Sequence, residues 1–195
     1  RGDRQRAIEA LGEAQTLGAD MVVTARMMAR LAAAAGDTTQ AALQLEQAAR
    51  LATERNRRDE AIEAWQALSQ LVPERLEPAR ACADLLAAAG RTDEAASTLR
   101  EGLARAKGAP EEVQLAAYEL LSRLAPNDTT AHDWLAKTYA KRRDRDGATR
   151  QLRLIAEAQE KSGDDVVLVE TLERIVVLGG EDSDLLRRLG AAHER

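Results

Sequence analysis

Residues 56–73 read NRRDEAIEAWQALSQLVP, and residues 2–19 read GDRQRAIEALGEAQTLGA. When the second segment is placed beneath the first, Ala7 falls under Ala61 and the four letters Ala-Ile-Glu-Ala coincide. The two segments are thus about 54 residues apart, and a match at a fixed distance along the chain indicates an internal repeat. This internal repeat therefore determines the expected class of fold, and no single motif is needed for that inference.

Two more copies of this pattern follow at nearly the same spacing. One column of large residues contains Leu11, Trp65, Tyr118 and Leu172. A second column contains Leu17, Leu71, Leu124 and Leu178. Four aligned copies at an almost constant spacing of about 53–54 residues indicate a repeat array rather than a chance similarity.

Each repeat is long enough for three helices, and helical spacing of apolar residues predicts where they lie. The expected helices cover 3–17, then 20–35, 38–54 and 58–72, then 75–89, 92–107 and 110–125, then 128–142, 145–162 and 165–178, and finally 182–194. We therefore expect one array over 1–195, about eleven helices long. It is divided into the end of a repeat (1–19), three full repeats (20–73, 74–126 and 127–180) and the start of another (181–195).

Local stop and start signals agree with these boundaries. Gly36 and Gly90 lie just past apolar helices, where glycine ends a helix at little cost. Pro73 and Pro126 stop the third helices of two repeats. Residues suited to accept hydrogen bonds from free amides at helix starts are Asp37, Thr92, Asp128, Asp164 and Asp182.

The composition favours helices. Apolar residues make up 45% of the chain, nearly all of them Ala, Leu, Val and Ile, and there is no Phe. The net charge of −5 argues against a nucleic-acid-binding protein, which needs a basic face to neutralise phosphates. The Ala- and Arg-rich composition is typical of a GC-rich bacterial genome.

The order of large and small residues resembles that of the tetratricopeptide repeat. In that pattern a large residue is followed by Leu, a small residue and an aromatic, and a second helix adds an Ala and a large residue. Residues that follow the pattern are Ala79, Cys82, Ala83, Leu86, Ala95 and Leu99, then His132, Leu135, Ala136, Tyr139, Ala148 and Leu152, and then Leu186, Leu189, Gly190 and His193. The chain departs from the pattern because its helices are grouped in threes.

The resemblance implies an all-α, right-handed α-solenoid of antiparallel helices that acts as a non-catalytic scaffold for a partner protein or peptide. Tetratricopeptide modules bind ligands along their first helices. The charged residues at the fifth and ninth pattern positions of those helices are Arg26, Arg30, Arg80, Asp84, Asp133, Lys137 and Arg187. These residues could hold an acidic peptide, and reversing the charge of Arg26, Arg30 and Arg80 should then abolish binding.

Two alternatives remain open for this set. The charges could be ordinary exposed side chains paired within one helix, as Arg80 and Asp84 are at i, i+4. The whole segment could also be a regulatory or spacer part of a larger multidomain signalling protein or enzyme. The flanking sequence would distinguish this second alternative from a self-standing scaffold.

No pattern in the sequence indicates catalysis, so we expect no enzyme activity, no cofactor and no metal. His132 and His193 are isolated, and Cys82 is the one cysteine, which leaves no metal-ligand spacing. Cys82 lies in an apolar helical run and is interpreted as a small core residue. The acidic pairs Glu111-Glu112 and Asp164-Asp165 lie at predicted helix starts, where they complement the helix dipole.

The basic run 141–145, Lys-Arg-Arg-Asp-Arg, is interpreted as a solvated turn, with contact to an acidic partner or membrane surface as the alternative. No segment is apolar enough to insert into a membrane, and no signal peptide precedes the first helix, so we expect a cytoplasmic location. The chain is interpreted as a segment of a longer protein. Self-association is a further possibility, through apolar residues at the two ends: Ile8, Leu11, Leu185, Leu186 and Leu189.

Overall fold

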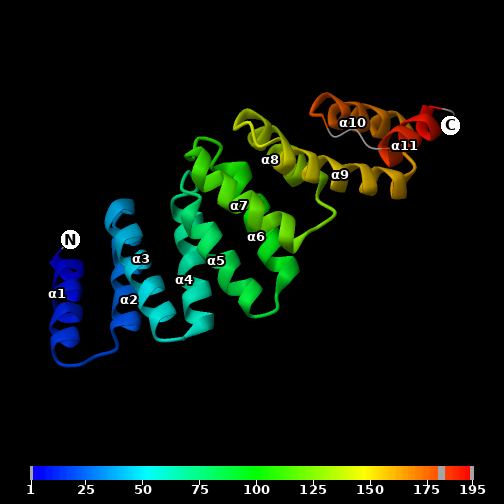
Figure 1. Ribbon diagram of the computed structural model, residues 1–195. Coiled ribbons are helices and arrows are strands. Elements are labelled where there is room, and N and C mark those ends of the chain that lie inside the picture. Colours follow the sequence, from blue (N-terminus) through cyan, green and yellow to red (C-terminus); the bar gives the residue numbers. More distant parts are fainter. Residues whose placement is uncertain (1, 180–182, 194–195) are drawn as a thin grey trace. The chain divides into compact units, whose positions relative to one another are not determined.

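The computed structural model describes residues 2–179 and 183–193, and every regular element in these ranges is an α-helix (Figure 1). The chain divides into two compact units, residues 1–110 and residues 111–195. The first unit contains α1 (Gly2–Thr16), α2 (Met21–Ala34), α3 (Thr38–Glu54), α4 (Arg58–Leu71), α5 (Glu77–Ala88) and α6 (Thr92–Arg105). The second unit contains α7 (Glu111–Leu124), α8 (Thr129–Lys141), α9 (Arg145–Ser162), α10 (Asp165–Val177) and α11 (Ser183–His193).

Within each unit, every helix packs against the next helix in the chain. The prediction of an all-α, tetratricopeptide-like repeat is confirmed, because the pattern residues of α5, α6, α8 and α9 are buried where these helices meet, apart from half-buried Tyr139. In α11 the pattern is not followed in the same way, since Leu186 is exposed. The buried pattern positions are Ala79, Cys82, Ala83, Leu86, Ala95, Leu99, His132, Leu135, Ala136, Ala148 and Leu152.

The core of the first unit is built mainly from alanine. Ala25 on α2, Ala48 on α3 and Ala61 on α4 belong to one buried cluster, which half-buried Trp65 and Leu85 cover. A methyl side chain lets helix axes approach closely, so that this core consists of contacts between backbones and short side chains. α5 and α6 also approach closely, because a Cβ added to Gly102 would lie 2.6 Å from Cβ of Ala79.

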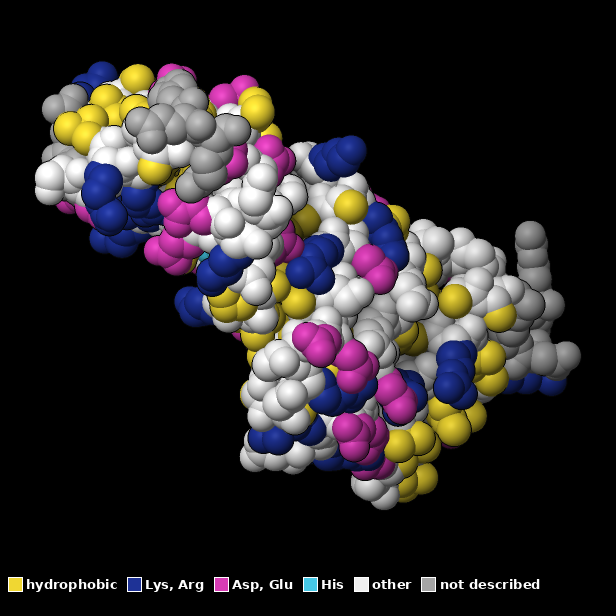
Figure 2. Space-filling view, turned by 90° about the vertical axis from the view of Figure 1, so that its right-hand side faces the viewer, with side chains coloured by type: hydrophobic (Ala, Val, Ile, Leu, Met, Phe, Trp, Pro, Cys, Tyr) yellow, Lys and Arg dark blue, Asp and Glu magenta, His cyan; other side chains and the backbone are white. Residues whose placement is uncertain are grey.

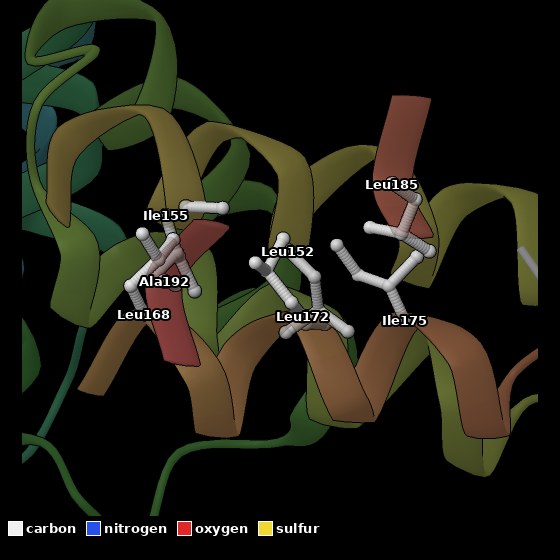
Figure 3. Packing of buried hydrophobic residues seen from close by; sticks show 9 residues of the cluster. Leu152, Ile155, Leu168, Leu172, Ile175, Leu185 and Ala192 are labelled. Atoms are coloured by element: carbon white, nitrogen blue, oxygen red, sulfur yellow. The ribbon is translucent and has the colours of Figure 1, made fainter. Parts of the chain in front are cut away.

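The core of the second unit uses larger residues. Figure 3 shows Leu152 and Ile155 of α9 pointing toward Leu168, Leu172 and Ile175 of α10. Leu185 of α11 joins this cluster and is only 2% exposed, which corrects the expectation that it is exposed and available for self-association. The reason is that α11 packs on α10 and directs Leu185 into the core.

The other terminal apolar residues have mixed positions. Leu186 is 53% exposed, as expected, whereas Leu189 packs against the core of the second unit. Leu11 is half-buried. The side chain of Ile8 lies outside the described residues.

Helix starts are fixed mostly by aspartate. The carboxylates of Asp37, Asp128 and Asp164 accept hydrogen bonds from amides in the following helix turn, as predicted. Asp20 and Asp144 act in the same way at the starts of α2 and α9.

Two further residues were predicted to cap helices, and neither is confirmed as a cap. Thr92 is not a cap, because α6 begins with it and Arg91 stands before it without a side-chain capping bond. Asp182 lies outside the described residues.

The glycines predicted to end helices are confirmed, and the start of one predicted helix is revised. Gly36 and Gly90 take positive φ angles of 80° and 77°, as expected for residues that end a helix. The helix expected over 75–89 is α5, which begins only at Glu77. Pro78 explains the later start, because proline lacks an N–H and is accommodated in the first turn of a helix.

Candidate functional site

A groove in the first unit lies between α2 and α4, with α3 beneath it, and has a volume of about 380 Å³. Most of its lining is apolar, with alanine the commonest residue, and charged side chains stand at its edges. We call it the first groove, and its lining residues are Arg26, Ala29, Arg30, Ala33, Leu45, Glu63, Ala64, Ala67, Gln70 and Leu71.

A second groove lies in the second unit between α8 and α10, with α9 beneath it, and has a volume of about 490 Å³. It also combines an apolar floor with charged edges. We call it the second groove, and its lining residues are Ala136, Lys137, Ala140, Leu152, Glu170, Glu173, Arg174, Val177 and Leu178.

The two grooves occupy the same place in the repeat. A shift along the chain by two whole repeats converts Leu45 of the first groove into Leu152 of the second. The same shift converts Arg30 into Lys137, and it also relates Ala29 to Ala136, Ala33 to Ala140, Glu63 to Glu170 and Leu71 to Leu178. The groove is therefore a recurring feature of the repeat rather than an accident of one helix pair.

An ion pair crosses the first groove. The Arg26 guanidinium on α2 donates a hydrogen bond to the Glu63 carboxylate on α4, with 2.5 Å between Nη2 and Oε2. Arg30, one helical turn further along α2, is exposed and makes no ion pair within the described part of the chain. The first groove therefore has one neutralised arginine and one that remains available.

An ion pair of opposite polarity stands at the second groove. Asp133 on α8 accepts a hydrogen bond from Arg174 on α10 at 2.8 Å, and it also pairs with Lys137 at 2.6 Å. Partial burial acts to raise the pKa of Asp133, but the hydrogen bonds from Lys137 and Arg174 outweigh it and lower the pKa. Asp133 therefore stays ionised and ties α8 to α10.

The other predicted site residues do not line either groove. Arg80 and Asp84 on α5 form the expected i, i+4 pair, with 3.8 Å between Nη1 and Oδ2. Arg187 on α11 pairs with Asp184 at 2.5 Å, and its side chain is largely exposed. Their grouping with Arg26 and Lys137 as one partner-binding set stays a prediction.

Reasoning from the first helices alone missed half of each groove wall. Glu63 and Gln70 on α4, and Glu170 and Arg174 on α10, face the first-helix charges. The signal was available in the repeat alignment, because the third helices recur with the same offset as the first helices. The alignment does not show, however, that the first and third helices of a repeat border the same groove.

Charged side chains of both signs are mixed on the face that Figure 2 shows, where Lys and Arg side chains are interspersed with Asp and Glu side chains. In the basic run 141–145, Lys141 pairs with Glu111 at 2.6 Å, and Arg142 pairs with both Glu111 and Glu112. The acidic start of α7 thus neutralises part of this run, which agrees with a solvated turn.

The remaining candidate groups are structural. Cys82 is fully buried, and burial raises the pKa of its thiol to about 11, so it is a core residue, as interpreted. His132 is buried, with Nδ1 2.7 Å from Oε1 of Gln151 and Nε2 2.9 Å from the Pro126 carbonyl oxygen. Among the described residues, no group of three or more His, Cys, Asp or Glu side chains is arranged to hold a metal ion.

No protein-family model and no curated protein match this sequence. Among solved structures, the MamA RS-1 ArsTM double mutant is similar at 12% identity and a TM-score of 0.34, over 78% of this chain and 94% of that chain. A thermophilic TPR protein from Thermus thermophilus is similar at 17% identity and a TM-score of 0.29, over 98% and 100% of the two chains. A tetratricopeptide repeat protein from Parabacteroides merdae is similar at 13% identity and a TM-score of 0.29, over 98% and 93%. Similarity this low says nothing of what this chain binds.

None of the described helices is long and apolar enough to cross a membrane.

Proposed function

We propose that this chain is a non-catalytic protein-interaction scaffold whose first and second grooves each bind a segment of a partner protein. The observation that supports this most is the recurrence of one groove at equivalent positions of two repeats. A groove that recurs in the repeat suits a partner that presents similar side chains to equivalent sites of different repeats.

The chemistry of the groove walls suits a peptide. The apolar lining is alanine and leucine in both grooves, with the exposed Val177 added in the second, and it can bury an apolar side chain of the partner. The charged edges can form hydrogen bonds or ion pairs with the partner's polar groups and so fix its register. A volume of 380–490 Å³ accommodates one or two side chains, so each groove is one subsite of a longer contact.

The two grooves should differ in charge preference. The first groove is lined by two arginines and one glutamate, whereas the second is lined by Lys137, Arg174 and two glutamates. Arg30 is left without an ion pair among the described residues, so an acidic residue of the partner should favour the first groove. The second groove offers no net charge and should select mainly by apolar contact.

Filling each groove tests this proposal. Ala33 and Ala140 are exposed, occupy equivalent places and line the two grooves, so Ala33→Trp and Ala140→Trp should each obstruct one groove without entering the core. Peptides selected on the wild-type chain from a random display library should lose about tenfold or more in affinity on at least one of these variants, measured by calorimetry.

Matched controls place the same tryptophan elsewhere on an exposed surface. Thr39→Trp on α3 and Thr130→Trp on α8 change exposed residues that line neither groove and should leave affinity unchanged. The proposal fails if selected peptides bind both groove-filling variants as tightly as the controls.

A further inference from the structure

The first unit has another hollow, between α1 and α2, with a volume of about 490 Å³. Five of its six lining residues are apolar, and the sixth is Arg30, which also lines the first groove. Met27 lies at this place and is 48% exposed, so its thioether can be reached from solvent. The lining residues are Ala7, Ala10, Leu11, Met27, Arg30 and Leu31.

The equivalent place in the second unit contains two aromatic rings. The shift by two repeats that relates the grooves also converts Leu11 into Tyr118 and Met27 into Trp134. Tyr118 on α7 and Trp134 on α8 are stacked, with ring centroids 4.3 Å apart and an angle of 18° between the ring planes. The repeat therefore accommodates an aromatic pair between these two helices, whereas the first unit presents aliphatic side chains and a hollow there.

We propose that the hollow between α1 and α2 is a subsite for an aromatic side chain of the partner, with Arg30 binding a carboxylate beside it. This inference rests on the proposed function in one respect, because Arg30 places the aromatic residue next to the segment bound in the first groove. An aromatic ring buries a large apolar area, and the thioether of Met27 makes favourable contacts with ring edges. Arg30 adds charge complementarity, since it has no ion pair among the described residues.

The aromatic side chain should come from a partner segment rather than from residues 1–195 of a second copy of this chain. The sequence has two Trp, two Tyr and no Phe. All four aromatic residues, Trp65, Tyr118, Trp134 and Tyr139, are half-buried within their own units. Tyr139 also donates a hydrogen bond to Glu119 at 2.8 Å. A second copy therefore has no free aromatic side chain to insert.

Methyl NMR of the full chain can test this subsite directly. The chain contains three methionines, so ¹³C-labelled methyl groups give three signals, of which Met27 lines the hollow. Titration with N-acetyl-tryptophan should move the Met27 signal upfield through the ring current, with a dissociation constant of about 1 mM for so small a probe. N-acetyl-leucine should leave the signal nearly unmoved.

Two variants separate the ring contact from the charge contact. Leu11→Trp fills the hollow from within and keeps Met27 as reporter, so added N-acetyl-tryptophan should cause no further shift. Arg30→Gln should keep the shift but remove the preference for N-acetyl-tryptophan over its uncharged amide, which we expect to be about threefold. Leu43→Trp on α3 is the control, because Leu43 is exposed and lines neither the hollow nor either groove.

The outcomes distinguish this inference from the proposed function. If Met27 does not respond to N-acetyl-tryptophan, or responds equally in Leu11→Trp, the aromatic subsite is refuted even where peptides bind the grooves. If Met27 responds as expected and no selected peptide depends on the grooves, the subsite stands and the proposed function fails. Equal binding of N-acetyl-tryptophan and its amide to the wild-type chain overturns the role of Arg30.

Discussion

Replacing Gly102 with alanine should destabilise the first unit, although alanine favours a helix more than glycine does. Gly102 is buried on α6, and a Cβ added to it would lie 2.6 Å from Cβ of Ala79 and 3.2 Å from Cδ1 of Leu76 on the α5 side. Carbon atoms in contact are normally about 3.5–4.0 Å apart. Because Cβ of Ala79 is fixed to its backbone, α5 and α6 would have to separate by about 1 Å to restore that distance.

The size of the effect follows from two opposing contributions. Overpacking a well-packed contact costs about 1–3 kcal/mol, and a separation of 2.6 Å between two Cβ atoms places this contact in the upper part of that range. Replacing glycine with alanine inside a helix returns about 1 kcal/mol. The free energy of unfolding should therefore fall by about 1–2 kcal/mol.

Denaturant unfolding can measure this change for the first unit alone. Trp65 lies in the first unit and Trp134 in the second, so fluorescence in a Trp134→Phe background reports on the first unit. Gly12→Ala on α1 is the matched control, because a Cβ there meets nothing within 4 Å and should stabilise by up to about 1 kcal/mol.

Adding Ala79→Gly to Gly102→Ala should recover part of the loss, since it removes the atom that clashes. The double-mutant cycle should give a favourable coupling of about 1 kcal/mol or more. If Gly102→Ala stabilises the chain as much as Gly12→Ala does, the close contact between α5 and α6 is not as described.

Three further predictions test other features. Arg143 has a φ of 62° at the position where earlier repeats have Gly36 and Gly90, so Arg143→Gly should stabilise the second unit by about 0.5 kcal/mol, measured by denaturant unfolding. The Cys82 thiol, with its pKa raised to about 11, should react with a thiol reagent only after denaturation, and rapid reaction of the folded chain would contradict its burial. The pKa of Glu111 is lowered from 4.5 by hydrogen bonds from Lys141 and Arg142. The ionised Glu111 side chain therefore stabilises the fold at pH values above 4.5, and this stabilisation is lost as the pH falls below 4.5 through the lowered pKa of the folded state. Glu111→Gln should flatten this pH dependence of the free energy of unfolding, monitored by the fluorescence of Trp134.

The sequence predicts the helices well because their signals are local. Apolar periodicity, glycine after a helix and aspartate before one all act within a few residues, and each predicted boundary among the described residues lies close to the observed one. Arg143 shows where this reasoning stops. It follows α8 in the left-handed conformation without being glycine, and nothing in its identity predicts that.

The site was only partly predictable, for a physical reason. Arg26, Arg30 and Lys137 were found from the first-helix pattern, and all three line grooves. Glu63 and Arg174, which form ion pairs with first-helix residues, come from third helices, and their proximity depends on how three helices pack. Burial of Leu185 was missed for the same reason, because it depends on contact between α10 and α11.

The ion pairs at the grooves change which charge should select the partner. Arg26 pairs with Glu63 in the first unit, and Asp133 pairs with Arg174 in the second, so a link between first and third helices is made with opposite polarity. Because the first helix carries the positive charge in one unit and the negative charge in the other, we infer that these ion pairs hold the first and third helices together rather than select a ligand. Arg30 has no such partner among the described residues, so preference for an acidic ligand should depend on it.

Exchanging the pair and reversing the single charge separate these roles. The double variant Arg26→Glu, Glu63→Arg keeps an ion pair between α2 and α4 and should change unfolding free energy by less than about 1 kcal/mol. It should also retain the affinity for acidic peptides that bind the first groove, measured by calorimetry. Arg30→Glu should lose that affinity while remaining folded. If the double variant loses binding as completely as Arg30→Glu, Arg26 contacts the partner directly, and the assignment of selectivity to Arg30 alone is wrong.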